Sequence, residues 1–96
     1  MTFSIRLTDG AIEDIEYFRT NERRIIADGI GLFLTHDADV ETNRRKPLRP
    51  NQISRWELRI DDFRIFYEIE ADVVKVVAVG HKTHNVLCIR GEKVEL

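Results

Sequence analysis

The sequence has a single cysteine, Cys88, so an internal disulfide framework is excluded. A lone cysteine in an apolar stretch favours packing over a nucleophilic role, and it suits a reducing compartment. No apolar run approaches the ~20 residues that span a bilayer. The opening MTFSIRLTDG also lacks the basic and apolar regions of a signal peptide. We therefore expect a cytoplasmic protein that does not enter a membrane.

Several familiar motifs are missing as well. The sequence contains no GxGxxG, P-loop or HExxH pattern, and no carboxylate lies in an apolar context that would favour glycosidase chemistry. His81 and His84 are three residues apart, but Lys82 between them makes a poor zinc site. We expect no cofactor and no metal. With 96 residues, no repeats and no low-complexity segment, residues 1–96 are expected to form one domain.

The charge is unevenly distributed along the chain. Residues 1–43 contain four basic and nine acidic residues, a balance of −5, whereas residues 44–96 contain eleven basic and eight acidic residues, a balance of +3. The formal net charge of −2 conceals this difference. A basic second half indicates a polyanion or an acidic protein as its partner.

The segment from Trp56 to Gly80 organises the predicted fold. It contains three runs of alternating apolar and polar residues, separated by Asp61-Asp62 and by Ala71-Asp72. Alternation bounded by turn residues is typical of an antiparallel meander. If both breaks are two-residue hairpin loops, the expected cross-strand pairs are Ile60–Phe63, Leu58–Ile65, Trp56–Tyr67, Tyr67–Val76 and Ile65–Ala78.

The opposite face of the meander is expected to carry charge, with Arg59 directly across from Arg64. Like charges facing each other between strands are destabilising. Two interpretations remain open: each arginine finds an acid of its own, which would be Asp61, Asp62 or Glu57, or the pair forms an anion site. His81 continues the alternation of Val79 and would emerge on this arginine side.

Before the meander, residues 3–7 read as a short strand, followed by two helices over about 10–19 and 21–34. Thr8 or Asp9 is the expected N-cap of the first helix and Asn21 that of the second. The apolar positions that recur at helical spacing are Ile12, Ile15, Phe18, Ile25, Ile26, Ile30, Leu32 and Phe33. Gly29 and Gly31 weaken the second helix, so close approach to a neighbouring element is expected at both.

The predicted fold class is therefore α+β. A two-helix hairpin packs on one face of a four-stranded, mostly antiparallel sheet in the order β-α-α-β-β-β, with a short extra C-terminal strand at 86–89 and a turn at Arg90-Gly91. The other face of the sheet is left open. Residues 36–50 are expected to be a loop, and four cations gather in its second half: Arg44, Arg45, Lys46 and Arg49.

Three basic groups would converge on the open face: the 44–49 loop, the strand arginines, and the cluster after Gly80. The loop is either solvated or a phosphate-binding segment. Cleavage of RNA needs a base for the 2′-OH, cations for the phosphorane and an acid for the leaving oxygen. Arginine and lysine supply the second need, and histidine suits the others. The groups in question are Arg55, Arg59, Arg64, His81, Lys82 and His84.

The whole chain resembles the RelE/ParE superfamily of type II toxins. The segments that carry the likeness are KPLRP (46–50), WELRIDDFRIFYEI (56–69) and VVKVVAVGHK (73–82), and the ending HNVLCIRGEKVEL is similar to a RelE subgroup. RelE-type toxins cut mRNA in the ribosomal A site without a metal and are held inactive by an antitoxin. The resemblance thus implies a RelE-like fold, a small acidic antitoxin, and mRNA and the ribosome as partners.

Residue by residue, the resemblance implies that Arg64 stabilises the phosphate, that Lys82 acts at the leaving group and that Arg55 matches a strand-start lysine. RNA contact would fall to Arg59 and the 44–49 loop. Two positions depart from the pattern: Glu57 stands where ribosome-dependent enzymes have a second lysine, and Cys88 stands near their catalytic tyrosine. Proton transfer would then fall to His81 or His84.

Three functions follow from these residues. The first is a metal-independent mRNA endoribonuclease that inhibits translation. The second is a ParE-like gyrase poison, a branch that shares the fold without the RNase residues and stops replication. The third is a catalytically inactive module that binds a small partner protein.

Overall fold

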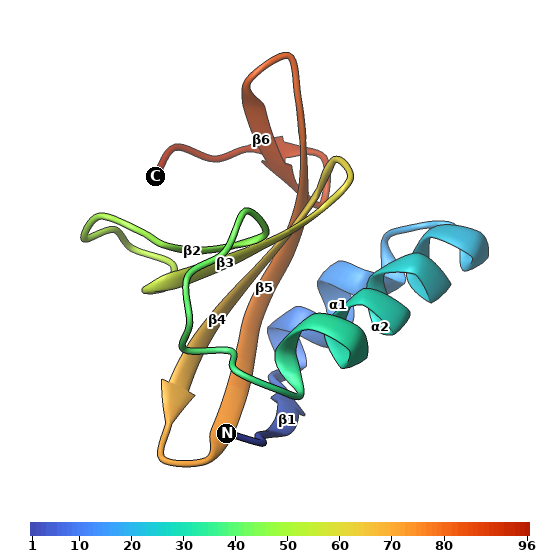
Figure 1. The fold of residues 1–96 in the computed structure, drawn as a ribbon. Coiled ribbons are helices and arrows are strands. Elements are labelled where there is room, and N and C mark those ends of the chain that lie inside the picture. Colours follow the sequence, from blue (N-terminus) through green and yellow to red (C-terminus); the bar gives the residue numbers. More distant parts are fainter.

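The computed structural model describes residues 1–96 and places two helices on one side of a curled sheet (Figure 1). Strands follow the order β2-β3-β4-β5-β6-β7, and β1 pairs in parallel with β5. The elements are β1 (Ser4–Leu7), α1 (Asp9–Glu16), α2 (Thr20–Leu34), β2 (Arg45–Pro47), β3 (Trp56–Ile60), β4 (Phe63–Glu70), β5 (Val73–Thr83), β6 (Val86–Ile89) and β7 (Glu92–Lys93).

The α+β class and the helix hairpin on one face are confirmed. The sheet, however, has more strands than predicted, because two short strands extend it. β2 lies within the stretch expected to be loop and pairs with β3, so part of the basic segment belongs to the sheet edge. β7 continues the sheet beyond β6. No helix is long and apolar enough to cross a membrane.

The meander register is confirmed for β3 and β4 along its whole length, including Arg59 opposite Arg64. Between β4 and β5 it holds only as far as Tyr67 opposite Val76. The next pair is Phe66 with Ala78, so Val77 is an extra residue, a β-bulge in β5. Ile65 therefore lies opposite Val79, and the predicted pairing of Ile65 with Ala78 is wrong.

The bulge reverses which side each later β5 residue faces. Val79 belongs to the core beneath the helices, and His81 lies opposite Phe63 on that same side. The His81 ring contacts Phe18 edge-to-face, with 6.1 Å between ring centroids. The prediction that His81 emerges beside the arginines is therefore wrong, because one inserted residue inverts a period-two alternation. Lys82 takes the opposite side.

Helix α1 holds the bulge in place. β1 pairs with β5 as far as Val76 and β6 pairs with it from His81, which leaves a gap along one edge of β5. The Thr8 amide donates to the Val76 carbonyl at 3.0 Å, and the Thr8 hydroxyl donates to the Val77 carbonyl at 3.4 Å. The Val79 amide donates to Oδ2 of Asp14 at 3.0 Å. The N-cap residue Thr8 and the Asp14 side chain of α1 thus make the hydrogen bonds that a neighbouring strand would otherwise make along this gap.

Asp14 is a buried carboxylate with only 4% of its side chain exposed. Its Oδ1 lies 2.9 Å from Nε of Arg90, which follows β6. Burial raises the pKa of Asp14, and the Val79 hydrogen bond and the Arg90 charge oppose that rise. Asp14 therefore links α1, the β5 bulge and the turn after β6.

Replacing Asp14 with alanine is expected to lower the free energy of unfolding by roughly 1–3 kcal/mol, because the Val79 amide loses its acceptor. Asp14→Asn keeps an oxygen there and should cost less. Because the folded-state pKa of Asp14 is raised, its ionisation opposes folding, and this penalty disappears as pH falls through that pKa. The original protein should gain stability relative to Asp14→Asn between pH 7 and about pH 4 in urea unfolding. Parallel pH profiles would contradict this.

The predicted N-cap is confirmed for α1 and is wrong for α2. The Thr8 hydroxyl caps α1 by accepting from the Ala11 amide at 3.1 Å. The N-cap of α2 is Arg19 rather than Asn21, and its amide donates to Glu22 at 3.1 Å. Helix α1 ends at Glu16, earlier than predicted. Of the expected apolar stripe, three side chains remain exposed: Ile12, Ile25 and Leu32.

The helices cover the predicted apolar face of the meander. The core joins Phe18, Ile26, Ile30 and Leu34 to residues from β3, β4 and β5, including Leu58, Ile65, Tyr67, Val76 and Val79. Gly29 allows this packing, because a side chain there would overlap Ile60 of β3. A side chain added at Gly31 would meet nothing within 4 Å, so the expectation of close approach holds for Gly29 and is wrong for Gly31.

Candidate functional site: the arginine face

The side of the sheet opposite the helices carries the candidate site, which we call the arginine face. It is defined by Lys46, Glu57, Arg59, Arg64 and Lys82, which the strand registers place on one side. Its apolar floor is formed by Phe66 and Leu87, both buried and both outside the helix-side core. The face was expected to be open, and its centre is instead well packed.

Glu57 lies between the two facing arginines. Its Oε2 accepts from Nε of Arg59 at 3.0 Å, and its Oε1 is 3.8 Å from Nε of Arg64. The Glu57 side chain is 5% exposed. Of the two interpretations left open by the sequence, the structure has the arginines partnered by an acid of the chain, although they share a single one.

Arg64 is further tied to the turn between β3 and β4. One of its terminal nitrogens donates to the carbonyls of Asp61 at 2.8 Å and Phe63 at 3.0 Å. The side chain is 15% exposed, and its Nε is buried without a hydrogen bond. Arg59, by contrast, is 45% exposed. Arg59 is therefore the more accessible of the two guanidiniums.

Close approach of β5 and β6 brings Lys82 to this face. Gly80 lies opposite Arg64, and a side chain on Gly80 would overlap the Cys88 carbonyl of β6. The Lys82 amide donates to the Asp62 carbonyl at 2.7 Å, which anchors the strand beside the β3–β4 turn. Lys82 pairs with Leu87, so its side chain shares the arginine face with Arg64.

The basic segment at 44–49 does not converge on the arginine face as predicted. Arg45 points to the helix side and donates to the carbonyls of Phe33 at 2.8 Å and Val40 at 2.9 Å. The Arg44 guanidinium lies over the Phe33 ring, 4.6 Å from its centroid. Both arginines thus hold the end of α2 against β2. Only Lys46 of this group lies on the arginine face, 3.6 Å from Glu41.

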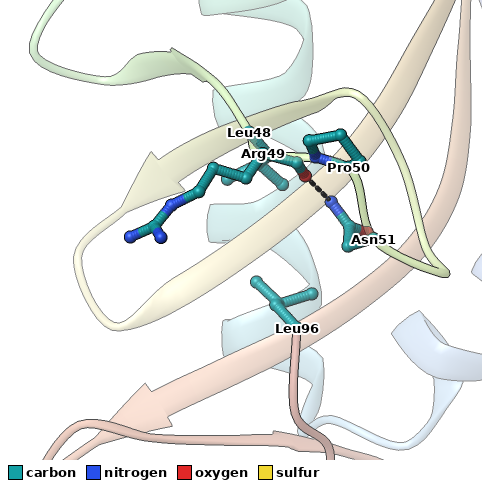
Figure 2. Close-up of a pocket in the computed structure, with 5 residues that line it drawn as sticks. All are labelled: Leu48, Arg49, Pro50, Asn51 and Leu96. Atoms are coloured by element: carbon teal, nitrogen blue, oxygen red, sulfur yellow. Dashed lines mark hydrogen bonds between the residues drawn. The ribbon is translucent and has the colours of Figure 1, made fainter.

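Arg49 and Arg55 lie at the edge of the sheet. Asn51 shapes their loop by donating to the carbonyls of Arg49 at 2.7 Å and Ser54 at 2.8 Å. Figure 2 shows Leu96 of the C-terminal tail facing this loop, while the Arg49 side chain extends away from Leu96. The cavity between them has a volume of about 450 Å³. Arg55 lines a neighbouring cavity of about 730 Å³ and donates its amide to Glu68 at 3.3 Å.

The histidines and tyrosines lie away from the arginine face. His81 lines a cavity of about 250 Å³ on the helix side. His84 is exposed in the β5–β6 turn, where its φ is +52°. His36 contacts Thr2 at 3.3 Å. Burial raises the pKa of Tyr67, whose hydroxyl donates to the Ala38 carbonyl at 2.8 Å, and Tyr17 is exposed after α1.

Of the predicted site residues, the structure thus gathers Arg59, Arg64, Lys82 and Lys46 and separates the others. The sequence offered Glu57 as one of three possible acids for the arginines, and the structure makes it the central group of the face. Its position in the predicted register, on the same side as the opposed arginines, was the signal that indicated it, but the sharing of one acid by both arginines was not predicted. No three His, Cys, Asp or Glu side chains are arranged to hold a metal ion.

Comparisons with known proteins identify the family. A family model described as the ParE toxin of the type II toxin-antitoxin system, parDE, matches residues 5–86. Among solved structures, the fold is similar to a chain of the toxin-antitoxin complex RelBE2 from Mycobacterium tuberculosis, with a TM-score of 0.73 and 19% identity over 85% of this chain and 100% of that one. Curated protein sequences gave no match. The chain belongs to the RelE/ParE superfamily of type II toxins.

Proposed function

We propose that this toxin stops growth by binding its target, in the manner of a ParE-like gyrase poison, rather than by cutting RNA. One observation carries the proposal. The arginine face presents cations and a carboxylate, whereas all three histidines and both tyrosines lie elsewhere. Residues 5–86 match a ParE toxin model, whereas the similar solved structure comes from a RelBE complex, so the proposal rests on the site.

The chemistry of RNA cleavage explains why this placement matters. Moving a proton off the 2′-OH and onto the leaving oxygen requires groups within hydrogen-bond reach of both. Histidine suits that task because its pKa lies near neutral pH. His81 is on the opposite side of the sheet from Arg64, and His84 is beyond the end of β5. Guanidiniums can bind a phosphodiester but do not move protons, and the one carboxylate of the face, Glu57, is already paired with both arginines.

A cognate antitoxin is the second part of the proposal. An acidic segment laid over the arginine face would meet the exposed guanidinium of Arg59 and the ammonium of Lys82. Binding there would cover the same cations that the toxin presents to its target. Toxin and antitoxin would meet in the cytoplasm, where the gyrase target also resides.

The mRNA endoribonuclease is a second candidate, favoured by the gathering of Arg59, Arg64 and Lys82 on one face. In that reading Arg64 stabilises the phosphorane and Lys82 assists the leaving group. Arg59 and Lys46 would contact the RNA backbone, and ribosome-bound mRNA would be the substrate. His84 would have to supply the proton transfer from the adjacent turn, with Arg49 and Arg55 at the margin.

Induction of the toxin alone in a bacterial host distinguishes these candidates. We expect growth arrest with a DNA-damage response, and primer extension on a translated message should show intact mRNA. Lys82→Gln should relieve the arrest, whereas Lys75→Gln should not, because Lys75 pairs with Glu70 at the far end of β5. Cleavage within codons that depends on Lys82 would instead favour the endoribonuclease. Normal growth at high levels of soluble protein would contradict both toxin activities.

A further inference from the structure

The position of Glu57 has a consequence for which ligands the arginine face accepts. A buried acid at the centre of a cationic face is costly unless it is paired, and Glu57 is paired with both facing arginines. The Nε of Arg59 donates to this carboxylate at 3.0 Å, and the Nε of Arg64 lies 3.8 Å from it without a hydrogen bond. The site that a bound phosphate would occupy between the two arginines is therefore already filled by the chain itself.

Charge counting gives the same result. Arg59, Arg64 and Glu57 together carry a formal charge of +1, whereas the two arginines alone would carry +2. Affinity for single-stranded nucleic acid depends on how many phosphates a protein neutralises, and each adds about 0.7 to the slope of log affinity against log salt concentration. An internal carboxylate that neutralises one guanidinium removes about one such contact.

We propose that Glu57 is a built-in counter-anion that limits the affinity of the arginine face for RNA. The carboxylate competes with phosphate for Arg59 and Arg64, and it is always present at short range. A partner that needs only the exposed nitrogens of Arg59 and the ammonium of Lys82 is affected less. The inference concerns binding by the purified chain, so it holds whether the toxin acts on gyrase or on mRNA.

The substitution Glu57→Gln tests this, because glutamine keeps the volume of the side chain and an oxygen that can accept from Arg59. The probe is a fluorescent single-stranded RNA oligonucleotide, followed by anisotropy over a range of salt concentrations. We expect roughly ten-fold tighter binding at low salt. The salt slope should steepen by about 0.7.

Glu70→Gln is the matched control, since it makes the same formal change of charge at the end of β4 that is far from Arg64. The Glu70 side chain is 60% exposed and pairs with Lys75, away from the facing arginines. We expect it to change RNA affinity less than about two-fold. Equal effects of the two substitutions would mean that only net charge matters, and an unchanged salt slope in Glu57→Gln would also overturn the proposal.

Loss of a buried charge also threatens folding, so circular dichroism in the assay buffer accompanies each titration. If Glu57→Gln is partly unfolded, all three proteins are compared at low temperature in concentrated sucrose, which favours the folded state. A folded Glu57→Gln protein that binds RNA no better than the original one contradicts the inference under either condition.

Discussion

Replacing Glu57 with alanine is expected to lower the free energy of unfolding by about 3–5 kcal/mol, because Arg59 and Arg64 would then face each other without their shared acid. Arg64 is the costlier partner to leave behind, since its side chain is mostly buried and Glu57 supplies its only opposite charge. A domain of this size has a total stability of roughly 5–15 kcal/mol. The change would therefore remove a large part of it.

Urea unfolding of a double-mutant cycle measures this effect. Removing Arg59 together with Glu57 eliminates one of the two opposed charges, so the double variant should be more stable than Glu57→Ala alone. Arg59→Ala by itself should cost less than Glu57→Ala, because the carboxylate loses its hydrogen bond to Arg59 but keeps its ion pair with Arg64. If Glu57→Ala costs less than about 1 kcal/mol, the acid does not hold the pair.

The second large effect is expected at Gly80. Gly80→Ala should lower the free energy of unfolding by about 3 kcal/mol or more, because the new methyl group would overlap the Cys88 carbonyl and the Ile89 side chain of β6. A backbone carbonyl cannot rotate away as a side chain can. β6 would have to move outward, and Lys82 and Leu87 would move with it.

Amide chemical shifts together with urea unfolding would test this prediction. The shifts should change most along β6 and at Lys82, while those of α2 stay constant. Gly31→Ala is the control, since the new methyl group would have no neighbour within 4 Å. Alanine also favours a helix over glycine by up to about 1 kcal/mol. Equal stability of Gly80→Ala and the original protein would show that β5 and β6 separate at little cost.

Much of the fold could be predicted from local patterns. Alternation from Trp56 to Ile69 and the Asp61-Asp62 break fixed the first hairpin residue by residue, and the opposition of Arg59 and Arg64 followed from it. The helical spacing of apolar residues located both helices to within a few positions. These features depend on neighbours close in sequence, and a single sequence contains that information.

The bulge in β5 could not be predicted in the same way. Nothing in the run from Val73 to Val79 distinguishes an inserted residue from a regular strand, because every position except Lys75 is apolar. The groups that stabilise the bulge, Thr8 and Asp14, are more than sixty residues away in sequence. A prediction made from alternation alone therefore placed His81 on the wrong side.

The cationic loop illustrates a different limit. Four cations lie within six positions of the sequence, yet each has a different environment: Arg44, Arg45, Lys46 and Arg49. The short strand β2 turns alternate side chains to opposite faces, and the carbonyls at the end of α2 attract the arginine that meets them. The composition of this segment predicted one basic patch, whereas the backbone places its cations on different sides of the sheet.

The extra residue at Val77 means that the chemistry of the arginine face depends on how β5 pairs with β4, and not only on which amino acids are present. A chain of this family with the same residues but a regular β5 would pair Ile65 with Ala78, and it would present an imidazole where this one presents an ammonium. Gain or loss of such a bulge thus offers evolution a way to exchange a proton donor for a fixed cation in a single step. Aligning such toxins by residue identity alone would hide that exchange.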